Sequence, residues 1–451
     1  MDGKGQIDTS GDETNQSFSW KKLIQYTGPG WLMSIAYLDP GNLESDLQSG
    51  AVAGYKLLWL LLWSHAAGLA IQILSARLGV VTGKHLAQLV RSNYSRPVGL
   101  AIWVFTQLAI IGSDIQEIIG TAIALKILFG FTLWVGVLIT ATDTFLFMWL
   151  QQYGVRKIEV FFMSLIGVMI ACFWIEMVSS HPSLSQILEG IIVPEIPREA
   201  TVQAVGMVGA VIMPHNMFLH SALVMTRDLG EKPSKLKIKE ANFYFAVESA
   251  LALLTSYFIN LAIVVVFAQV FYRPGQIITE LPGLYDASRV LSNTLGEYAR
   301  YLWAAGLLAA GQSSTMTGTL AGQYVVEGFF GAIFRKQWHR VALTRAVALV
   351  PSMMVAVLAV ERFDTMGEIL NVLQRVMTHT FKTKPFARYL CWTISWVVIG
   401  FNTYLFINNL GELNWPLLLV MLSIGYFAFV FYLVWIPLNP EDGVEQSEDF
   451  E

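Results

Sequence analysis

Long apolar segments separated by polar stretches dominate the chain between residues 29 and 437. A helix needs about 20 apolar residues to cross the hydrocarbon core of a bilayer. By that measure the sequence predicts an all-α polytopic membrane protein with about 11 full spans. A shorter amphipathic segment, 365–378, follows the ninth span. The predicted spans are 29–48, 56–77, 98–125, 130–151, 157–179, 202–226, 243–271, 301–327, 342–360, 388–410 and 414–437.

The first apolar segment carries polar and helix-breaking residues near its middle, Asp39-Pro40-Gly41-Asn42. Pro40 lacks a backbone donor and clashes with the preceding turn, and Gly41 adds backbone freedom. A carboxylate inside a span is costly and normally faces a partner or a water-filled cavity. We therefore expect the helix to break here, which leaves free carbonyls, Asp39 and Asn42 as a cluster of oxygen ligands.

The sixth apolar segment repeats this pattern with Met213-Pro214-His215-Asn216. One proline alone is a weak signal, because kinked helices are common in membranes. Proline-interrupted helices at matching positions of two halves are typical of inverted-repeat transporters, whose site lies at the midplane. The pair predicts a first repeat (21–180, spans one to five) and a second repeat (202–386, spans six to ten). The remaining parts are a polar, disordered cytoplasmic tail (1–20), two further spans (387–437) and an acidic tail (438–451).

Composition and charge agree with a membrane protein and add its orientation. Of the 451 residues, 55% are hydrophobic and 14% are charged, whereas soluble domains carry about 25% charged residues. Lys and Arg are concentrated in alternate loops, which the positive-inside rule assigns to the cytoplasm. The N-terminus is then cytoplasmic, the loops 180–201 and 272–300 lie outside, and the Lys232–Lys239 run is a cytoplasmic loop. Plasma membrane and endosomal or vacuolar membranes fit equally well.

The residues at the two breaks offer different kinds of metal ligand. Asp39 supplies a charged oxygen, Asn42 an amide oxygen and Met213 a thioether sulfur. Unwinding before the second proline frees a carbonyl such as that of Ala210. Hard ions such as Ca²⁺ gain nothing from sulfur, whereas a thioether beside a carboxylate favours divalent transition metals. The alternative interpretation is that Met213 packs in the core or against lipid and that Asp39 pairs elsewhere as a structural acid.

Titratable residues near the second break and in the third span are candidates for proton transfer. His215 follows the proline directly, His220 lies five residues further on, and histidine titrates near physiological pH. Asp114 and Glu117 are three residues apart and therefore share a helix face. They indicate a polar file or an ion-pair network, with Arg345 of the ninth span as a candidate partner. Other intramembrane polar residues, interpreted as mainly structural, are Asp143, Glu248 and His65.

Four ordered motifs carry a resemblance to a known family: Asp39-Pro40-Gly41-Asn42, Met213-Pro214-His215-Asn216, Ser113-Asp114-Ile115-Gln116-Glu117 and Gly311-Gln312-Ser313-Ser314-Thr315-Met316-Thr317-Gly318-Thr319. With them the chain resembles the natural resistance-associated macrophage protein (Nramp) family of proton-coupled divalent metal transporters. The resemblance implies a leucine-transporter-like fold of inverted five-helix repeats with two extra C-terminal helices. It implies metal binding by Asp39, Asn42, Met213 and the carbonyl of Ala210, approached in closed states by Asn371. The implied proton route is Asp39, His215, His220, Asp114, Glu117 and Arg345.

The sequence departs from the family in the tenth span. Leu370–Gln374 matches the start of that span, but the run Arg375–Pro385 that follows is charged and does not cross a bilayer. Most of the tenth span is therefore missing by this comparison. Three explanations compete: an error or skipped exon in the gene model, a splice variant, or a divergent and inactive paralogue.

The function predicted from these features is proton-coupled symport of Mn²⁺ or Fe²⁺ into the cytoplasm by alternating access. Two alternatives stay open: an organic-substrate transporter on the same fold, and a transport-impaired form that acts as a sensor or scaffold. We expect no enzymatic activity, because the sequence shows no nucleophile–base constellation and no phosphate-binding loop. We also expect no resident cofactor, no nucleic-acid binding and no protein partner; the expected partners are divalent metal ions, protons and the bilayer.

Overall fold

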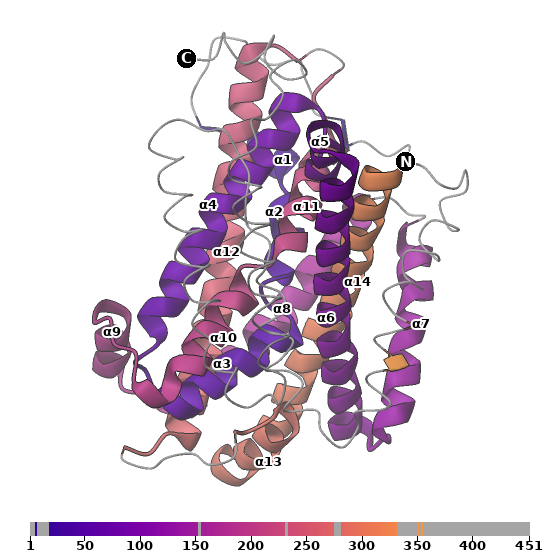
Figure 1. The fold of residues 1–451 in the computed structure, drawn as a ribbon. Coiled ribbons are helices and arrows are strands. Elements are labelled where there is room, and N and C mark those ends of the chain that lie inside the picture. Colours follow the sequence, from indigo (N-terminus) through magenta and orange to yellow (C-terminus); the bar gives the residue numbers. More distant parts are fainter. Residues whose placement is uncertain are drawn as a thin grey trace, which may run out of the picture.

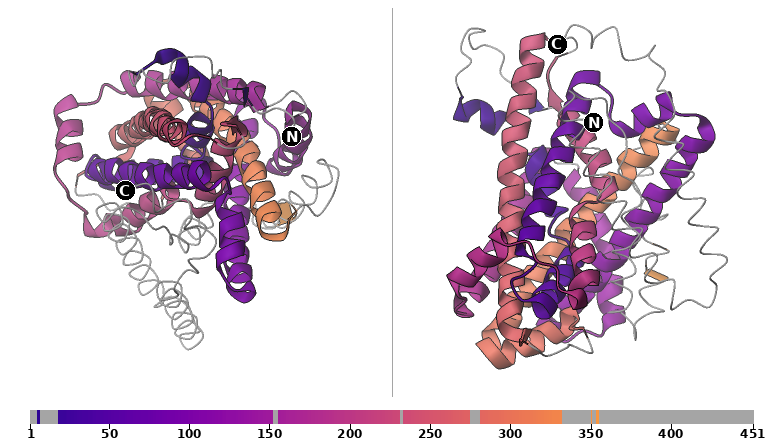
Figure 2. Two further views of the ribbon diagram at one scale, coloured as in Figure 1. Left: turned by 90° about the horizontal axis from the view of Figure 1, so that it is seen from above. Right: turned by 60° about the vertical axis from the view of Figure 1, so that its left-hand side comes forward.

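The structure, a computed structural model, describes residues 5–6, 18–151, 155–230, 233–274, 281–331, 350 and 353–354. The spans predicted over 388–410 and 414–437, almost all of the span 342–360, and the segment 365–378 lie outside these residues. So do Arg345 and Asn371. Within the described part the chain is built from helices, which run roughly alongside one another through the bundle (Figures 1 and 2).

The first predicted span is interrupted where the sequence places the break. A short helix, α1 (Trp20–Tyr26), precedes it, and the span itself consists of α2 (Pro29–Ile35) and α3 (Pro40–Ala53). The sixth span is interrupted in the same way, between α10 (Thr201–Val211) and α11 (Pro214–Leu223). Both second halves begin on a proline, because proline needs no amide partner in the first turn of a helix.

Uninterrupted helices account for the other described spans. Among the described residues, five segments are long and apolar enough to cross a membrane: Leu58–Thr82, Arg96–Phe129, Lys157–Ser179, Arg198–Thr226 and Lys235–Phe271. The fourth of these is the interrupted sixth span, and the other four are continuous helices. The last helix, α14, is not among them, because glycine, serine and threonine replace apolar residues over 311–319. The helices are α4 (Leu58–Thr82), α6 (Arg96–Phe129), α7 (Leu133–Gln151), α8 (Val155–Ser179), α12 (Lys235–Phe271) and α14 (Glu297–Phe330).

Short elements mark the two ends of the bundle (Figure 1). α1 and α5 (Leu86–Asn93) lie at one end, while α9 (Leu184–Ile192) and α13 (Leu284–Leu295) lie at the other. The predicted alternation of loops agrees with this, because α9 and α13 occupy the two segments expected on the same side. Between α9 and α10 lies the 3₁₀ turn η1 (Arg198–Ala200), and the turn η2 (Val224–Thr226) follows α11.

Two details at the α1–α5 end differ from expectation. Within the tail predicted to be disordered, β1 (Gly5–Gln6) pairs in parallel with β2 (Arg227–Asp228). The Lys232–Lys239 run is not all loop, because α12 begins at Lys235. Ser234 accepts a hydrogen bond from the amide of Lys237 and so caps the helix, which favours a start before the apolar segment.

The interrupted helices lie at the centre of the bundle. In Figure 1, α2, α3, α10 and α11 lie between α4 and α12 on one side and α6 and α14 on the other. The largest buried apolar cluster draws on α2, α3, α6, α8, α12 and α14. Glycine permits a close approach of α6 to the first break: a Cβ atom on Gly120 of α6 would lie 2.4 Å from Pro40 Cβ. The breaks are thus enclosed by protein, as non-helical backbone at membrane depth requires.

Candidate functional site

The break in the first interrupted helix is organised by Asp39. This residue is the N-cap of α3, and its Oδ1 accepts hydrogen bonds from the amide of Asn42 (2.7 Å) and from Asn42 Nδ2 (3.1 Å). Both side chains are buried at 1% exposure. A side-chain oxygen in this position satisfies the free amides of the first helical turn. The cap therefore fixes the carboxylate at the start of α3, beside the amide group of Asn42.

The break in the second interrupted helix presents sulfur in place of the carboxylate. Met213 is the N-cap of α11, has extended backbone angles and is 1% exposed. Because Pro214 has no N–H, it cannot donate to the carbonyl of Ala210 four residues earlier. Ala210 is 1% exposed and lies in the last turn of α10. Its carbonyl oxygen thus lacks the helical amide partner and is freed next to the thioether.

The same spacing identifies a candidate ligand that the sequence prediction missed. Pro40 cannot donate to the carbonyl of Ala36, which lies four residues before it just as Ala210 precedes Pro214. Ala36 is 5% exposed and forms the C-cap of α2. α3 packs against α10, and α2 packs against α11. The two breaks therefore form one central region with a freed carbonyl from each interrupted helix.

Polar side chains of the surrounding helices hold the first break in place. Asn260 of α12 donates from Nδ2 to the carbonyl of Tyr37 (3.0 Å), and the hydroxyl of Ser256 donates to the carbonyl of Ser34 (3.0 Å). The Tyr37 hydroxyl donates to Gln72 of α4 (3.1 Å). The Asn260 contact satisfies the Tyr37 carbonyl at the break, and Ser256 adds a second donor to the Ser34 carbonyl, which also accepts from the amide of Tyr37, so the break is a built feature of the fold. His65, interpreted as structural, lies 3.4 Å from Asn260.

The two histidines of the sixth span lie in different surroundings on the same helix. His215 is 4% exposed, and its Nδ1 has no hydrogen-bond partner among the described residues. His220 is fully buried, and its Nε2 lies 3.5 Å from the hydroxyl of Ser249 on α12. His215 directly follows the proline of the break, whereas His220 lies near the end of α11. Both rings are shielded from solvent in this structure.

Asp114 and Glu117 lie together on α6, as their spacing predicts. They are 0% and 2% exposed, and Ser113 donates a 3.0 Å hydrogen bond to Glu117 Oε1. α6 packs against α14 here: a Cβ atom on Gly318 would lie 3.2 Å from Asp114 Oδ1 and 3.6 Å from Glu117 Oε1. The glycine leaves room for both carboxylates between the helices. Their expected partner, Arg345, lies outside the described residues.

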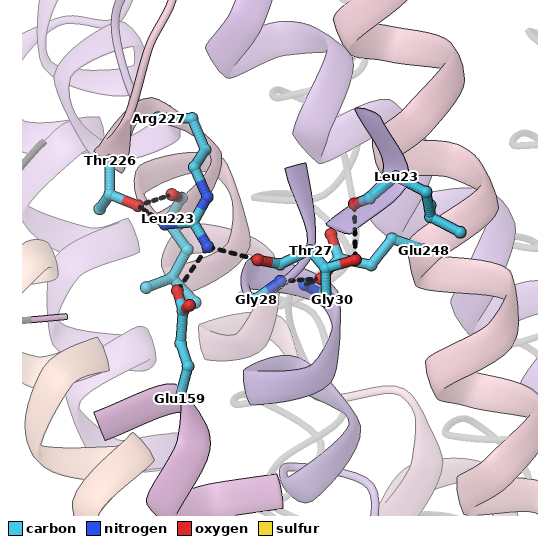
Figure 3. Close-up of polar contacts among 9 residues, drawn as sticks. All are labelled: Leu23, Thr27, Gly28, Gly30, Glu159, Leu223, Thr226, Arg227 and Glu248. Carbon is cyan, nitrogen blue, oxygen red and sulfur yellow. Dashed lines mark hydrogen bonds and ion pairs between the residues drawn. The ribbon is translucent and has the colours of Figure 1, made fainter. Parts of the chain in front are cut away.

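A buried ionic cluster ties the α1–α5 ends of both interrupted helices to their neighbours (Figure 3). Arg227 follows η2, and its Nη2 donates to Glu159 Oε1 of α8 and to the carbonyl of Thr27, both at 2.7 Å. Arg227 and Glu159 are each 3% exposed. On the other side of this junction, Glu248 of α12 accepts hydrogen bonds from the amides of Gly28 and Gly30 at the start of α2.

Glycine at position 28 is what admits this cluster. Its φ of +142° is in a region that other residues rarely adopt. A Cβ atom there would lie 2.1 Å from Arg227 Nη2 and 2.2 Å from Glu159. Glu248, which the sequence analysis interprets as mainly structural, holds the start of α2 through the amides of Gly28 and Gly30. Together Arg227, Glu159 and Glu248 form what we call the α2 clamp, which holds the start of the first half-helix.

The donor set at the breaks fits a transported ion better than a resident one. Among the described residues, no group of three or more His, Cys, Asp and Glu side chains is placed to hold a metal. The central region instead offers one carboxylate, one amide, one thioether and backbone carbonyls. Such a mixed set with a single charge suits a divalent transition metal that must be released again.

Comparison with known proteins finds a matching family model and similar metal transporters. The family model described as "Natural resistance-associated macrophage protein-like" (Nramp) matches residues 30–379. The chain is 44% identical over 456 residues to Metal transporter Nramp3.2 of Populus trichocarpa, covering 95% of this chain and 90% of that protein. It is 44% identical over 472 residues to Natural resistance-associated macrophage protein 2 of Homo sapiens, covering 94% of this chain and 83% of that protein.

Solved structures show the same fold. A crystal structure of the Eremococcus coleocola manganese transporter, in complex with an aromatic bis-isothiourea compound, superposes with a TM-score of 0.79 at 29% identity. It covers 94% of this chain and 96% of its own. Mhp1, a nucleobase-cation-symport-1 family transporter, matches with a TM-score of 0.55 at 15% identity, over 93% of this chain and 96% of its own. The second likeness concerns the fold alone.

Proposed function

Because the chain belongs to the Nramp family of metal transporters, as its match over residues 30–379 shows, we propose that it is a proton-coupled symporter of divalent transition metals. It is a multi-pass integral membrane protein, and the proposed direction of transport is into the cytoplasm. One observation carries the proposal: each of two central helices is broken at a proline, with a buried ligand at its N-cap and a freed carbonyl four residues earlier.

Each proposed ligand contributes a different property. Asp39 supplies the charge that attracts a cation, and the amide oxygen of Asn42 remains available because its nitrogen already bonds Asp39. The sulfur of Met213 favours Mn²⁺ and Fe²⁺ over Ca²⁺, because only soft or borderline ions gain from a thioether. The freed carbonyls of Ala36 and Ala210 add neutral oxygens from the two helices.

Apart from Asp39, the proposed proton route uses groups that do not bind metal. Asp39 exchanges its proton when the metal arrives, and His215 and His220 lie along α11 from the site towards the α1–α5 end. Asp114 and Glu117 form a second acidic pair between α6 and α14. Two members of the proposed set, Arg345 and Asn371, lie outside the described residues and enter the proposal through the family resemblance.

The deciding experiment is metal uptake by the purified full chain in proteoliposomes. Quenching of an entrapped metal-sensitive dye by Mn²⁺ is measured with and without an acidic exterior. We expect faster quenching with the gradient, and we expect Asp39→Ala to abolish it. A rate of Mn²⁺ uptake that is the same with and without the pH gradient contradicts proton coupling. An unchanged rate in Asp39→Ala contradicts the proposed site. Ca²⁺ serves as the hard-ion control.

A transport-impaired form remains the competing function, and the altered tenth span is what favours it. The family match ends at residue 379, within the charged run Arg375–Pro385. The alignment to the human relative is 472 residues long, which is more than the whole of this 451-residue chain, and only 94% of this chain is aligned in it. That relative therefore has residues without a counterpart here. Sequencing the transcript between the codons for Gln374 and His379 tests the origin; an uninterrupted transcript of this sequence rules out a gene-model error.

An organic substrate is disfavoured by the ligands themselves. Half-helix N-termini in this fold hold substrate carboxylates in some transporters, but here the buried carboxylate of Asp39 occupies that position and repels an anion. A competition assay that adds amino acids or nucleobases to the Mn²⁺ uptake reaction is expected to show no inhibition.

A further inference from the structure

α3 is unusually polar for a helix at the centre of a membrane protein. Its buried polar residues include Asn42, Glu44, Ser45, Asp46, Gln48 and Ser49. Asp46 is 2% exposed, and its Oδ2 has no hydrogen-bond partner among the described residues. A buried carboxylate without a partner is costly, and such groups in membrane proteins face an ion or proton path. The proposed transport function has so far assigned nothing to this residue.

Asp46 lies on the same face of α3 as the proposed metal ligands. Asp39, Asn42, Asp46 and Ser49 follow each other at intervals of three and four residues, which places them on one side of an α-helix. Asp46 is seven residues beyond Asp39, about 10 Å further along the axis at 1.5 Å per residue. The stripe runs from the break towards the end of the bundle where α9 and α13 lie, the proposed outer end.

α10 brings a second unpartnered oxygen to this stripe. A Cβ atom on Gly206 of α10 would lie 3.3 Å from the Ser45 hydroxyl, so the two helices touch at this level. Gln203 precedes Gly206 by three residues and therefore shares its face. It is 6% exposed, and its Oε1 has no partner among the described residues. The hydroxyls of Ser45 and Ser49 also lack partners there.

α12 packs against the stripe from another side. Gly50 of α3 lies against the carbonyl of Val264, and Gly54 lies against the ring of Tyr272, so α3 and α12 are in contact beyond Asp46. Asn260 of α12 lies further back, at the level of the break. The side chain of Asn260 is fully buried; its Nδ2 holds the Tyr37 carbonyl, while its Oδ1 has no partner among the described residues.

We propose that Asp46, with oxygens of Ser49 and Gln203, forms a second cation-binding station between α3 and α10, outward of the Asp39–Met213 site. The ligand class is a partly hydrated divalent cation. α3 and α10 carry no Lys or Arg, so neither helix offsets the negative charge of Asp39 and Asp46. A cleft lined by one sign of charge raises the local concentration of the opposite ion.

The station differs from the inner site in selectivity. It offers oxygen donors and no sulfur, so it binds Mn²⁺ and Ca²⁺ by charge with little discrimination. Its role is to capture the ion and pass it inwards, whereas the Met213 sulfur at the inner site selects Mn²⁺ over Ca²⁺. This assignment rests on the proposed transport function, but its binding arm below does not require transport.

The test uses Asp46→Asn, which removes the charge and keeps the shape. In proteoliposomes we expect the KM for Mn²⁺ uptake to rise about threefold to tenfold, since the variant loses local enrichment of the cation. The maximal rate and the preference for Mn²⁺ over Ca²⁺ stay within twofold of the unchanged chain. Asp46→Glu restores the KM. The matched control is Glu44→Gln, an acid-to-amide change on another face of α3, which leaves the KM unchanged.

Equilibrium binding separates this proposal from the transport function. Mn²⁺ binding to the purified chain is followed by electron paramagnetic resonance in Asp39→Ala and in Asp39→Ala with Asp46→Asn. We expect weak residual binding in the first and its loss in the second. Equal binding in both, or an unchanged KM in Asp46→Asn, overturns the station. Absence of uptake by the unchanged chain overturns the transport function alone, because the binding comparison still decides the station.

Discussion

Replacing Arg227 by methionine is the sharpest test of the α2 clamp. The change keeps an extended side chain of similar volume but leaves Glu159 as a buried charge, at 3% exposure, without its 2.7 Å partner. It also removes the donor to the Thr27 carbonyl. Breaking a buried ion pair from one side typically costs about 3–5 kcal/mol, mostly because the remaining charge is uncompensated. We therefore expect a loss of about 3–5 kcal/mol in stability.

The second half of this test removes the stranded charge. In Arg227→Met with Glu159→Gln the buried carboxylate is gone, so we expect the double variant to regain about 2 kcal/mol or more relative to Arg227→Met. The matched control is the Lys22–Glu240 pair at the same end, at 2.6 Å with both side chains 31% exposed. Lys22→Met should cost less than about 1 kcal/mol, because exposed pairs are screened by water.

The measurement is thermal and denaturant unfolding of the purified full chain in detergent, followed by tryptophan fluorescence. The same variants are scored for protease sensitivity at Thr27–Gly28, since release of the start of α2 exposes that junction. If Arg227→Met lowers the free energy of unfolding no more than Lys22→Met does, the Arg227–Glu159 pair does not contribute the expected stability. If the double variant is as unstable as the single one, the cost arises from lost packing rather than from the stranded charge.

Three further predictions follow from individual positions. Met213→Ala should lower selectivity for Mn²⁺ over Ca²⁺ more than it lowers Mn²⁺ uptake in a liposome flux assay, because only the softer ion uses the sulfur; equal losses contradict this. Gly28→Ala should destabilise the chain more than Gly83→Ala in the same unfolding assay, because both glycines have positive φ but only at Gly28 does a Cβ meet Arg227 and Glu159; equal effects mean that φ alone decides. Burial lowers the pKa of His85 to about 4, so the unfolded chain binds a proton on this side chain more readily than the folded chain does. The free energy of unfolding should therefore fall as pH drops from about 6.5 towards 4. His85→Gln should flatten that part of the curve of stability against pH, and an unchanged slope refutes the assignment.

The helix breaks were predictable because their chemistry is local. Pro40 and Pro214 remove donors whatever surrounds them, and Asp39 before the first proline already suggests an N-cap. The structure adds that each proline frees one defined carbonyl, that of Ala36 and that of Ala210. The first of these was overlooked, although the four-residue spacing to the proline was readable in the sequence.

The α2 clamp was not predictable, because its members are far apart in sequence. Arg227 and Glu159 are separated by 68 positions, and Gly28 and Glu248 by 220. Taken alone, each charge fits a loop or a structural role, and Gly28 fits any turn. Packing of α2 against α8 and α12 brings them together. The boundary of α12 was misjudged for a related reason: hydropathy marks where a span enters the membrane, whereas the helix begins earlier, at a serine cap.

Charges are distributed unequally along the two halves of the first interrupted helix, and this bears on direction. On α3, Asp39 and Asp46 face inwards without a Lys or Arg on the same helix, so the route from the α9–α13 end attracts cations. At the start of α2 the clamp pairs Arg227 with Glu159, and the amides of Gly28 and Gly30 bond one oxygen of Glu248, so among the described residues Glu248 is the acid of the clamp without an ion-pair partner of its own. In the proposed direction of transport, a metal ion that arrives from the α9–α13 side meets Asp46 and Asp39 before it reaches the α2 clamp, and we expect its release to require that the contacts at Gly28 break. Transport in the proposed direction then depends on coupling occupation of the Asp39–Met213 site to release of the clamp, through the seven residues of α2 that join them.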